Sequence, residues 1–301
     1  MKKMMKAVLI IIVMIVAVLI LMIKLGTKSE AVPSNYAEST STGGELEKEY
    51  LATGEYKVAH VEGDFPKESD SDWKSYVIYY PKELDKSDYK YPVVVSCNGT
   101  GVPASRYPDL LEHLASWGFI VLGNEDPNTA PGDSAKATLD ILLALNEDQN
   151  SIFYQKLDTE NIGIYGHSQG AHAVFNCIQN TDVFKTAVAL SPSDAEHAES
   201  NKMPYEYEST NISLLLLAGS GMDAIDLDNM NIMYEKLNCP RLFARKTGIN
   251  HGEMLYSADG YVTAWFCWQL QENENAAKIF LGENPEIFSN GLYQDQKSEL
   301  Q

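Results

Sequence analysis

The chain has 301 residues, of which 45% are hydrophobic, a size that suits one large α/β domain with short appendages. Its 23 Lys and Arg residues stand against 42 Asp and Glu residues, which gives a formal net charge of −19 at pH 7. Because such a surface repels a phosphate backbone, we expect no nucleic acid partner.

The N-terminal part has the composition of a membrane segment. Residues 7–23 are an unbroken run of Ala, Val, Leu, Ile and Met with lysines on both sides. A helix of this length approaches the thickness of a bilayer core, and the lysines before it favour a cytoplasmic N-terminus. Residues 1–28 are therefore predicted to be a single-pass membrane anchor, with the main domain, residues 49–301, outside the cytoplasmic membrane. The alternative is a cleaved signal segment, with Ser29-Glu30-Ala31 as the cleavage site and a secreted domain.

A polar stretch separates the membrane segment from the main domain. Residues 29–48 are rich in Ser, Thr, Glu and Gly and contain few large apolar side chains. Such a segment cannot bury enough apolar surface to order itself. We therefore predict a flexible linker over residues 29–48.

The four cysteines are far apart and form no C-x-x-C pair, which argues against a zinc site and a thioredoxin-type redox motif. They are Cys97, Cys177, Cys239 and Cys267. In an exported domain Cys239 and Cys267 could form a disulfide bridge; the alternative is that all four are small buried apolar residues. No metal or cofactor is expected.

From residue 49 onward, short apolar runs alternate with helical stretches, which is typical of a mainly parallel sheet flanked by helices. Strands are predicted at 56–61, 75–80, 92–97, 119–122, 161–165, 186–190, 213–218 and 241–246, the first two as an antiparallel edge hairpin. Helices are predicted at 107–116, 135–145, 169–178, 227–237 and 262–270, the last of which closes the fold. The loop 124–133 follows a strand end and is expected to line a site. The polar segment 193–211 is expected to be a solvated loop, with a small cap as the alternative.

A G-x-S-x-G pattern, Gly166-His167-Ser168-Gln169-Gly170, lies between a predicted strand and a predicted helix. In this context the pattern indicates a tight turn that presents the serine hydroxyl to a substrate, while the glycines let strand and helix pass closely. Ser168 is the predicted nucleophile. The backbone amide of Gln169, at the helix N-terminus, is predicted to stabilise an oxyanion.

A serine nucleophile needs a base, and the base needs a carboxylate to orient it. Of the six histidines, only His251 lies in a loop after the last predicted strand, flanked by glycines, so it is the predicted base. Asp223 is the first carboxylate after the strand 213–218 and is the predicted acid, with Asp226 and Asp228 as alternatives.

The second oxyanion donor is expected in the loop after the first central strand, which reads Cys97-Asn98-Gly99-Thr100-Gly101. Two glycines allow backbone amides to turn inward. We predict that the Thr100 amide is this donor, with Gly99 and Gly101 as alternatives.

These residues resemble the α/β-hydrolase superfamily, and more narrowly its dienelactone-hydrolase, chlorophyllase and polyester-hydrolase (cutinase-like) branch. The resemblance runs from about Tyr76 to Gln269, and the run "LASWGF" within residues 113–121 is its most telling part. Many relatives have His-Gly where this chain has Asn98-Gly99, and dienelactone hydrolases have a cysteine in place of Ser168. The resemblance implies an α/β-hydrolase fold over residues 49–301.

The implied function is carboxylic-ester hydrolysis through an acyl-enzyme, on a small-molecule or polymer ester, without metal or cofactor. An acyltransferase or a peptidase using the same Ser-His-Asp triad is the first alternative. A binding domain that kept the fold without catalysis is the second.

Overall fold

The computed structural model describes residues 31–66, 73–86, 88–179 and 181–300. The predicted membrane segment, residues 7–23, lies outside these ranges. Within them, no helix combines the length and the apolar character needed to cross a bilayer.

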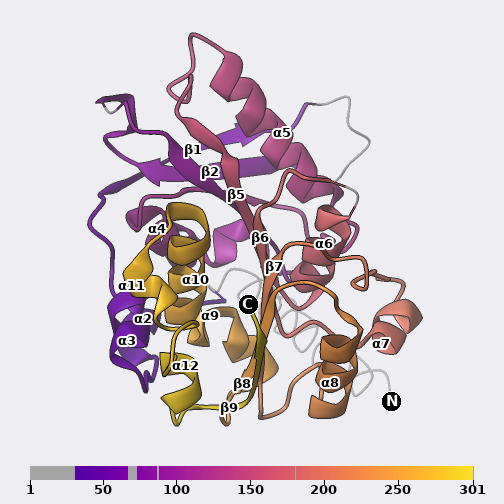
Figure 1. Ribbon diagram of the computed structural model, residues 1–301. Coiled ribbons are helices and arrows are strands. Elements are labelled where there is room, and N and C mark those ends of the chain that lie inside the picture. Colours follow the sequence, from indigo (N-terminus) through magenta and orange to yellow (C-terminus); the bar gives the residue numbers. More distant parts are fainter. Residues whose placement is uncertain (1–30, 67–72, 87, 180, 301) are drawn as a thin grey trace, which may run out of the picture.

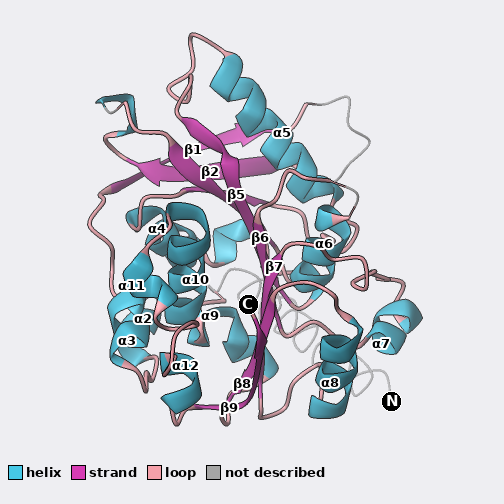
Figure 2. Ribbon diagram, viewed as in Figure 1, coloured by secondary structure: helices cyan, strands magenta, loops and turns pink. Residues whose placement is uncertain are grey.

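A single mixed sheet forms the middle layer of the described chain (Figure 2). Its strands are β1 (Val58–Asp64), β2 (Ser75–Pro81), β3 (Tyr91–Cys97), β4 (Ile120–Asn124), β5 (Leu157–His167), β6 (Thr186–Leu190), β7 (Ser213–Gly219), β8 (Arg241–Lys246) and β9 (Tyr293–Glu299). The order across the sheet is β1-β2-β4-β3-β5-β6-β7-β8-β9. Strands β3 to β8 are parallel, whereas the pairs β1–β2, β2–β4 and β8–β9 are antiparallel. The predicted mainly parallel sheet and its antiparallel edge hairpin are confirmed.

Helices cover both faces of the sheet (Figure 1). The longer ones are α4 (Pro108–Ser116), α5 (Asp133–Glu147), α6 (Gln169–Ile178), α8 (Leu227–Lys236) and α10 (Asp259–Gln271). The short ones are α2 (Tyr36–Ser39), α3 (Glu45–Leu51), α7 (Ala195–Ser200), α9 (Met254–Ser257), α11 (Glu274–Ala277) and α12 (Glu286–Ser289). Helices α4 and α10 share one core with Val94, while α5, α6 and α8 share the other with Val93 and Val95. Successive strand residues thus point to opposite faces, and both faces are buried.

The N-terminal segment is part of the folded domain, so the prediction of a flexible linker over residues 29–48 is wrong for residues 31–48. Val32 and Tyr36 are buried, and Figure 1 shows α2 and α3 beside the yellow C-terminal helices. The Tyr36 hydroxyl donates to Asp259 at 2.7 Å, and Asp259 also pairs with His113 at 2.7 Å. A few apolar and aromatic side chains, together with buried polar partners, order a segment whose average composition is polar.

This segment enters the domain at the edge of the sheet where the parallel strands end. The Ala31 amide donates to the Arg106 carbonyl oxygen at 2.7 Å. Arg106 in turn donates from its guanidinium to the carbonyl oxygen of Gly101, at 3.3 Å, in the loop that follows β3. The N-terminal segment is therefore linked, through Arg106, to the loop that is predicted to supply an oxyanion donor.

The C-terminal end of the fold also differs from the prediction, because helix 262–270 does not close it. After α10 the chain forms α11 and α12 and then adds β9 as an antiparallel strand on β8. The sequence of β9, Tyr-Gln-Asp-Gln-Lys-Ser-Glu, carries almost no apolar alternation. Its pairing with β8 is stabilised by an ion pair between Arg245 and Asp295 at 2.7 Å.

All four cysteines are buried and free. The alternative of a Cys239–Cys267 bridge is therefore not what the structure contains, and the four thiols serve as small apolar side chains in the core.

Candidate active site

The serine of the G-x-S-x-G pattern occupies a sharp turn between β5 and α6. Ser168 has φ 59° and ψ −122°, a backbone conformation that L residues rarely adopt. A Cβ atom at Gly166 would lie 2.3 Å from the Gly170 carbonyl oxygen, and one at Gly170 would lie 2.1 Å from the Cys97 carbonyl oxygen. Glycine is therefore required at both positions for strand and helix to pass at this distance.

We expect Gly170→Ala to lower the free energy of unfolding by roughly 3 kcal/mol or more, because the new methyl group must displace backbone rather than a flexible side chain. Urea denaturation measures this change. Gly252→Ala is the matched control, since a Cβ atom there would meet no atom within 4 Å. Equal stability of the two variants would contradict the close approach described above.

The predicted nucleophile, base and acid lie in one hydrogen-bonded row. His251 Nε2 is 2.9 Å from Ser168 Oγ, and His251 Nδ1 is 2.8 Å from Asp223 Oδ1. Ser168 follows β5, Asp223 follows β7, and His251 follows β8, so the carboxyl ends of three parallel strands bring the three side chains together. The His251 side chain is 32% exposed whereas that of Asp223 is 2% exposed, which leaves the row open to solvent only at its serine and histidine end.

Asp223 accepts more hydrogen bonds than the one from His251. Its Oδ2 accepts from the Ser191 hydroxyl at 2.7 Å and from the Gly219 amide, and its Oδ1 accepts from the Ala224 amide at 2.6 Å. Burial alone would raise the pKa of this carboxyl, but the hydrogen bonds from His251, Ser191 and the two amides outweigh it and lower the pKa. Asp223 is thus held as a carboxylate facing His251.

Ser191 is a residue that sequence reasoning missed. It is fully buried at the end of β6, and its φ of 46° lies in the left-handed region. The available signal was its position directly after a predicted strand, next to the strand that leads to Asp223.

His167, beside the nucleophile, supports the loop that carries His251. Its Nε2 lies 2.7 Å from the His251 carbonyl oxygen, so the proton sits on Nε2 and is donated to that carbonyl. Burial, together with the nearby His251, lowers the pKa of His167 to about 4. His167 is therefore a neutral donor near pH 7.

The loop after β3 lies against the serine turn. A Cβ atom at Gly99 would lie 3.9 Å from Ser168 Cβ, and the Gly101 amide is already engaged by the Pro127 carbonyl oxygen at 3.4 Å. Of the alternatives for the second oxyanion donor, Gly101 is therefore disfavoured, and Thr100 remains in the turn between Gly99 and Val102. The Gln169 amide, in the first turn of α6, needs no partner within the helix.

The buried side chain of Asn98 anchors the loop after β3 to the loop 124–133. Its side chain is fully buried, and its Nδ2 donates to the carbonyl oxygens of Asn124 and Asp126, both at 2.9 Å. Thr129 completes the contact, because its hydroxyl donates to the Asn98 carbonyl at 2.6 Å and its amide to Gln169 Oε1 at 3.0 Å. The loop 124–133 therefore lies beside the candidate site, as predicted.

The segment 193–211 packs onto α6 through His172. His172 Nε2 accepts from the Ser193 amide at 3.1 Å, and its ring stacks on Tyr205 at 4.6 Å between centroids. The segment carries the short helix α7, and Tyr205 and Tyr207 are buried. It is therefore anchored at these tyrosines, while its tip, including Lys202, is exposed.

The stability of the protein should depend on pH through His172 and His167. Burial lowers the pKa of His172 to about 4, and that of His167 also to about 4. An unfolded histidine titrates near about 6.5, so between these values the unfolded chain binds more protons and stability falls on acidification. We expect each residue to contribute a slope of about 1.4 kcal/mol per pH unit. His172→Gln, which keeps an acceptor for Ser193, should remove one such contribution in urea denaturation at pH 5 and pH 7; an unchanged slope would contradict this.

Among the described residues, no group of His, Cys, Asp and Glu is arranged to hold a metal ion.

Two comparisons with known proteins bear on this architecture. The search of curated proteins finds no match to the chain. The chlorophyllase family matches residues 47–233, a range that includes Ser168 and Asp223 but ends before His251. This match covers more than half of the 301 residues. The chain therefore belongs to the chlorophyllase family, a family of ester hydrolases within the α/β-hydrolase superfamily.

Proposed function

We propose that the protein is a serine carboxylic-ester hydrolase that works through an acyl-enzyme. The observation that carries the proposal is the row Ser168–His251–Asp223, with 2.9 Å and 2.8 Å between successive polar atoms. Both distances are those of hydrogen bonds that allow proton transfer. Family membership supports ester hydrolysis in general, and this row supplies the nucleophile and the base.

The mechanism follows from the geometry. Ser168 Oγ attacks the ester carbonyl carbon while His251 Nε2 takes the hydroxyl proton, and His251 then returns that proton to the leaving alcohol. Water repeats the cycle and releases the acid. Asp223 keeps the second proton of His251 on Nδ1 and stabilises the imidazolium that forms.

The tetrahedral intermediate needs donors for its oxyanion. The amides of Gln169 and Thr100 are the proposed pair, because one opens α6 and the other lies in the loop that approaches Ser168. A donor of this kind contributes roughly 3 to 4 kcal/mol to lowering the barrier.

Two side chains at the triad are at least partly exposed to solvent, which bears on the kind of ester that could reach it. Met222, next to Asp223, is 84% exposed, and the His251 side chain is 32% exposed. Solvent therefore reaches the histidine end of the row, and the proposed substrate is an ester on a small molecule or on a polymer chain.

The test is labelling of the full chain, in detergent micelles, with a fluorophosphonate probe that reacts only with an activated serine. Wild type should be labelled and Ser168→Ala should not. Hydrolysis of p-nitrophenyl esters from acetate to palmitate then gives the preferred acyl length. A folded wild type that is neither labelled nor active on any ester would sink the proposal, and preferential use of an alcohol acceptor or an amide substrate would move it to an acyltransferase or a peptidase.

We also propose that residues 1–28 hold this activity at the outer side of the cytoplasmic membrane, on the strength of the apolar run 7–23 and its lysines. Intact cells should expose the catalytic domain to added protease, and membranes should retain it after a high-salt wash. Release of active enzyme into the medium would instead support cleavage of the segment.

A further inference from the structure

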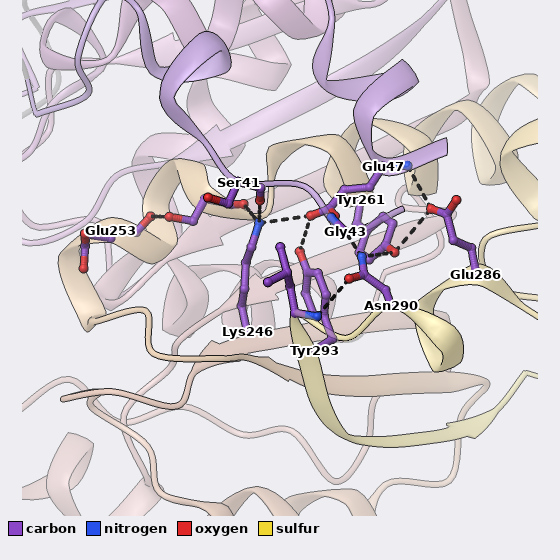
Figure 3. Close-up of polar contacts among 11 residues, drawn as sticks. Ser41, Gly43, Glu47, Lys246, Glu253, Tyr261, Glu286, Asn290 and Tyr293 are labelled. Carbon is purple, nitrogen blue, oxygen red and sulfur yellow. Dashed lines mark hydrogen bonds and ion pairs between the residues drawn. The ribbon is translucent and has the colours of Figure 1, made fainter. Parts of the chain in front are cut away.

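A buried lysine stands at the end of the strand that leads to the catalytic histidine. Lys246, the last residue of β8, is 2% exposed. Its ammonium donates to the Ser41 carbonyl oxygen at 2.9 Å, to Glu47 Oε1 at 3.0 Å and to the Ser257 carbonyl oxygen (Figure 3). These three acceptors satisfy all three protons of the ammonium group.

Two of those acceptors belong to the N-terminal segment, which is itself held firmly. Glu47 is 1% exposed, and its carboxylate also accepts from the Tyr293 hydroxyl at 3.0 Å and from Asn290 Nδ2 at 2.8 Å. The Glu47 amide donates to Glu286 at 2.8 Å. Figure 3 shows these side chains converging from the N-terminal segment, β8 and the C-terminal end of the chain. The position of the Lys246 ammonium is therefore fixed from outside β8.

The third acceptor connects Lys246 to the turn that carries His251. Ser257 ends α9, and its hydroxyl donates to the Glu253 carbonyl oxygen at 2.7 Å. Glu253 forms a capping box with Asn250: the Asn250 backbone amide donates to Glu253 Oε2 at 3.2 Å. Asn250 Oδ1 accepts from the Met222 amide at 3.0 Å, and the His251 amide donates to the Met222 carbonyl oxygen at 2.8 Å. The histidine turn is thus held at one end by the loop before Asp223 and at the other by Lys246 through Ser257.

We propose that Lys246, fixed in place by the N-terminal segment 41–47, is a positioning residue that holds the turn of His251 at hydrogen-bond distance from Ser168. This inference rests on the proposed function, in which His251 is the base. It adds that residues 41–47, which were predicted to be a flexible linker, take part in building the active site.

The chemistry of the pair is consistent with a positioning role. Burial lowers the pKa of Lys246, while the charge of Glu47 and its hydrogen bond oppose that effect. Desolvating a lysine and a carboxylate together is costly, and an apolar pair of similar volume often stabilises a fold equally well. An apolar pair would, however, offer no donor to the Ser257 carbonyl oxygen.

The experiment compares wild type, Lys246→Met, the double variant Lys246→Met/Glu47→Gln, and the control Arg245→Met, all as full chains. Arg245 precedes Lys246 on β8, but its ion pair with Asp295 leads away from the histidine turn. For Lys246→Met we expect kcat on an ester to fall by about 10- to 100-fold, with little change in KM. This is the loss expected when the catalytic base is displaced by up to about one ångström. Arg245→Met should keep the wild-type kcat.

The double variant separates positioning from stability. Lys246→Met leaves the Glu47 carboxylate buried without a counter-charge, so the melting temperature of the single variant should fall. Neutralising Glu47 in the double variant should restore the melting temperature. The kcat of the double variant should stay low, because the donor to the Ser257 carbonyl oxygen is still missing. Recovery of kcat together with the melting temperature, or a wild-type kcat in Lys246→Met assayed well below its melting temperature, would overturn the inference.

A second readout does not depend on having found a substrate. The proton that His251 Nδ1 shares with Asp223 should give a low-field ¹H NMR resonance in wild type and in Arg245→Met, and this resonance should shift or broaden in both Lys246→Met variants. An unchanged resonance would count against positioning by Lys246. Absence of ester hydrolysis in wild type would count only against the proposed function.

Discussion

Replacing His251 by alanine is expected to lower kcat for ester hydrolysis by about 10⁶-fold, a loss comparable to that from removing the nucleophile itself. Without the imidazole, no group at 2.9 Å from Ser168 Oγ can take the hydroxyl proton. The nearest other imidazole, that of His167, already donates from Nε2 to the His251 carbonyl oxygen and has a pKa lowered to about 4, which makes it a weak base. Steady-state hydrolysis and the rate of fluorophosphonate labelling should fall together.

His60→Ala is a suitable control for this substitution. His60 is exposed on the edge strand β1, far from the strand ends that carry the triad. The control should keep wild-type activity. If His251→Ala retained more than about one part in a hundred of the wild-type kcat, another group would have to be the base, and the assignment of His251 would be wrong.

Asp223→Asn is expected to lower kcat by about 10⁴-fold with little change in KM. The carboxylate accepts four hydrogen bonds, from His251, Ser191, Gly219 and Ala224, so every partner that faces it is a donor. An asparagine of the same shape must turn its NH₂ group toward one of these donors. Where that donor is His251, the imidazole carries its proton on Nε2 instead and cannot accept the proton of Ser168.

Asp226→Asn provides the matched comparison. Asp226 was the first alternative for the acid, but the structure places its carboxylate at the N-terminus of α8, where Oδ1 accepts from the Asn229 amide at 2.8 Å. Asparagine caps helices about as well as aspartate, so both stability and kcat should stay near wild type. Equal losses in the two variants would mean that neither carboxylate orients His251.

Much of the fold could be predicted because strongly apolar strands and periodic helices have local signatures. The helix 169–178 and the strands 186–190 and 241–246 were predicted with the bounds that the structure has. The serine turn was recognisable since its glycines answer a local steric demand, the approach of α6 to β3 and β5. That Ser168, Asp223 and His251 lie side by side could be predicted because each follows a strand in the chain order of this fold.

What could not be predicted depends on partners far away in the sequence. The N-terminal segment is ordered by pairs such as Glu47 with Lys246 and Tyr36 with Asp259, and no local pattern reveals such partners. Strand β9 is similar, because its polar side chains carry no strand signal and only the free edge of β8 makes it a strand. Ser191 was missed for the same reason, since its role appears only when β6 and β7 lie side by side.

The contact of Ala31 with Arg106 fixes the place at which the chain before residue 31 joins the folded domain. Arg106 reaches the loop after β3, so Ala31 is held near the loop that approaches Ser168. The stretch 24–30, even when fully extended, spans no more than about 25 Å. With residues 7–23 in a bilayer, the loop after β3 would be held near the lipid headgroups, at a distance no greater than the width of a small domain. Esters that diffuse laterally in that surface would then meet Ser168 by a two-dimensional search, without having to enter the surrounding water.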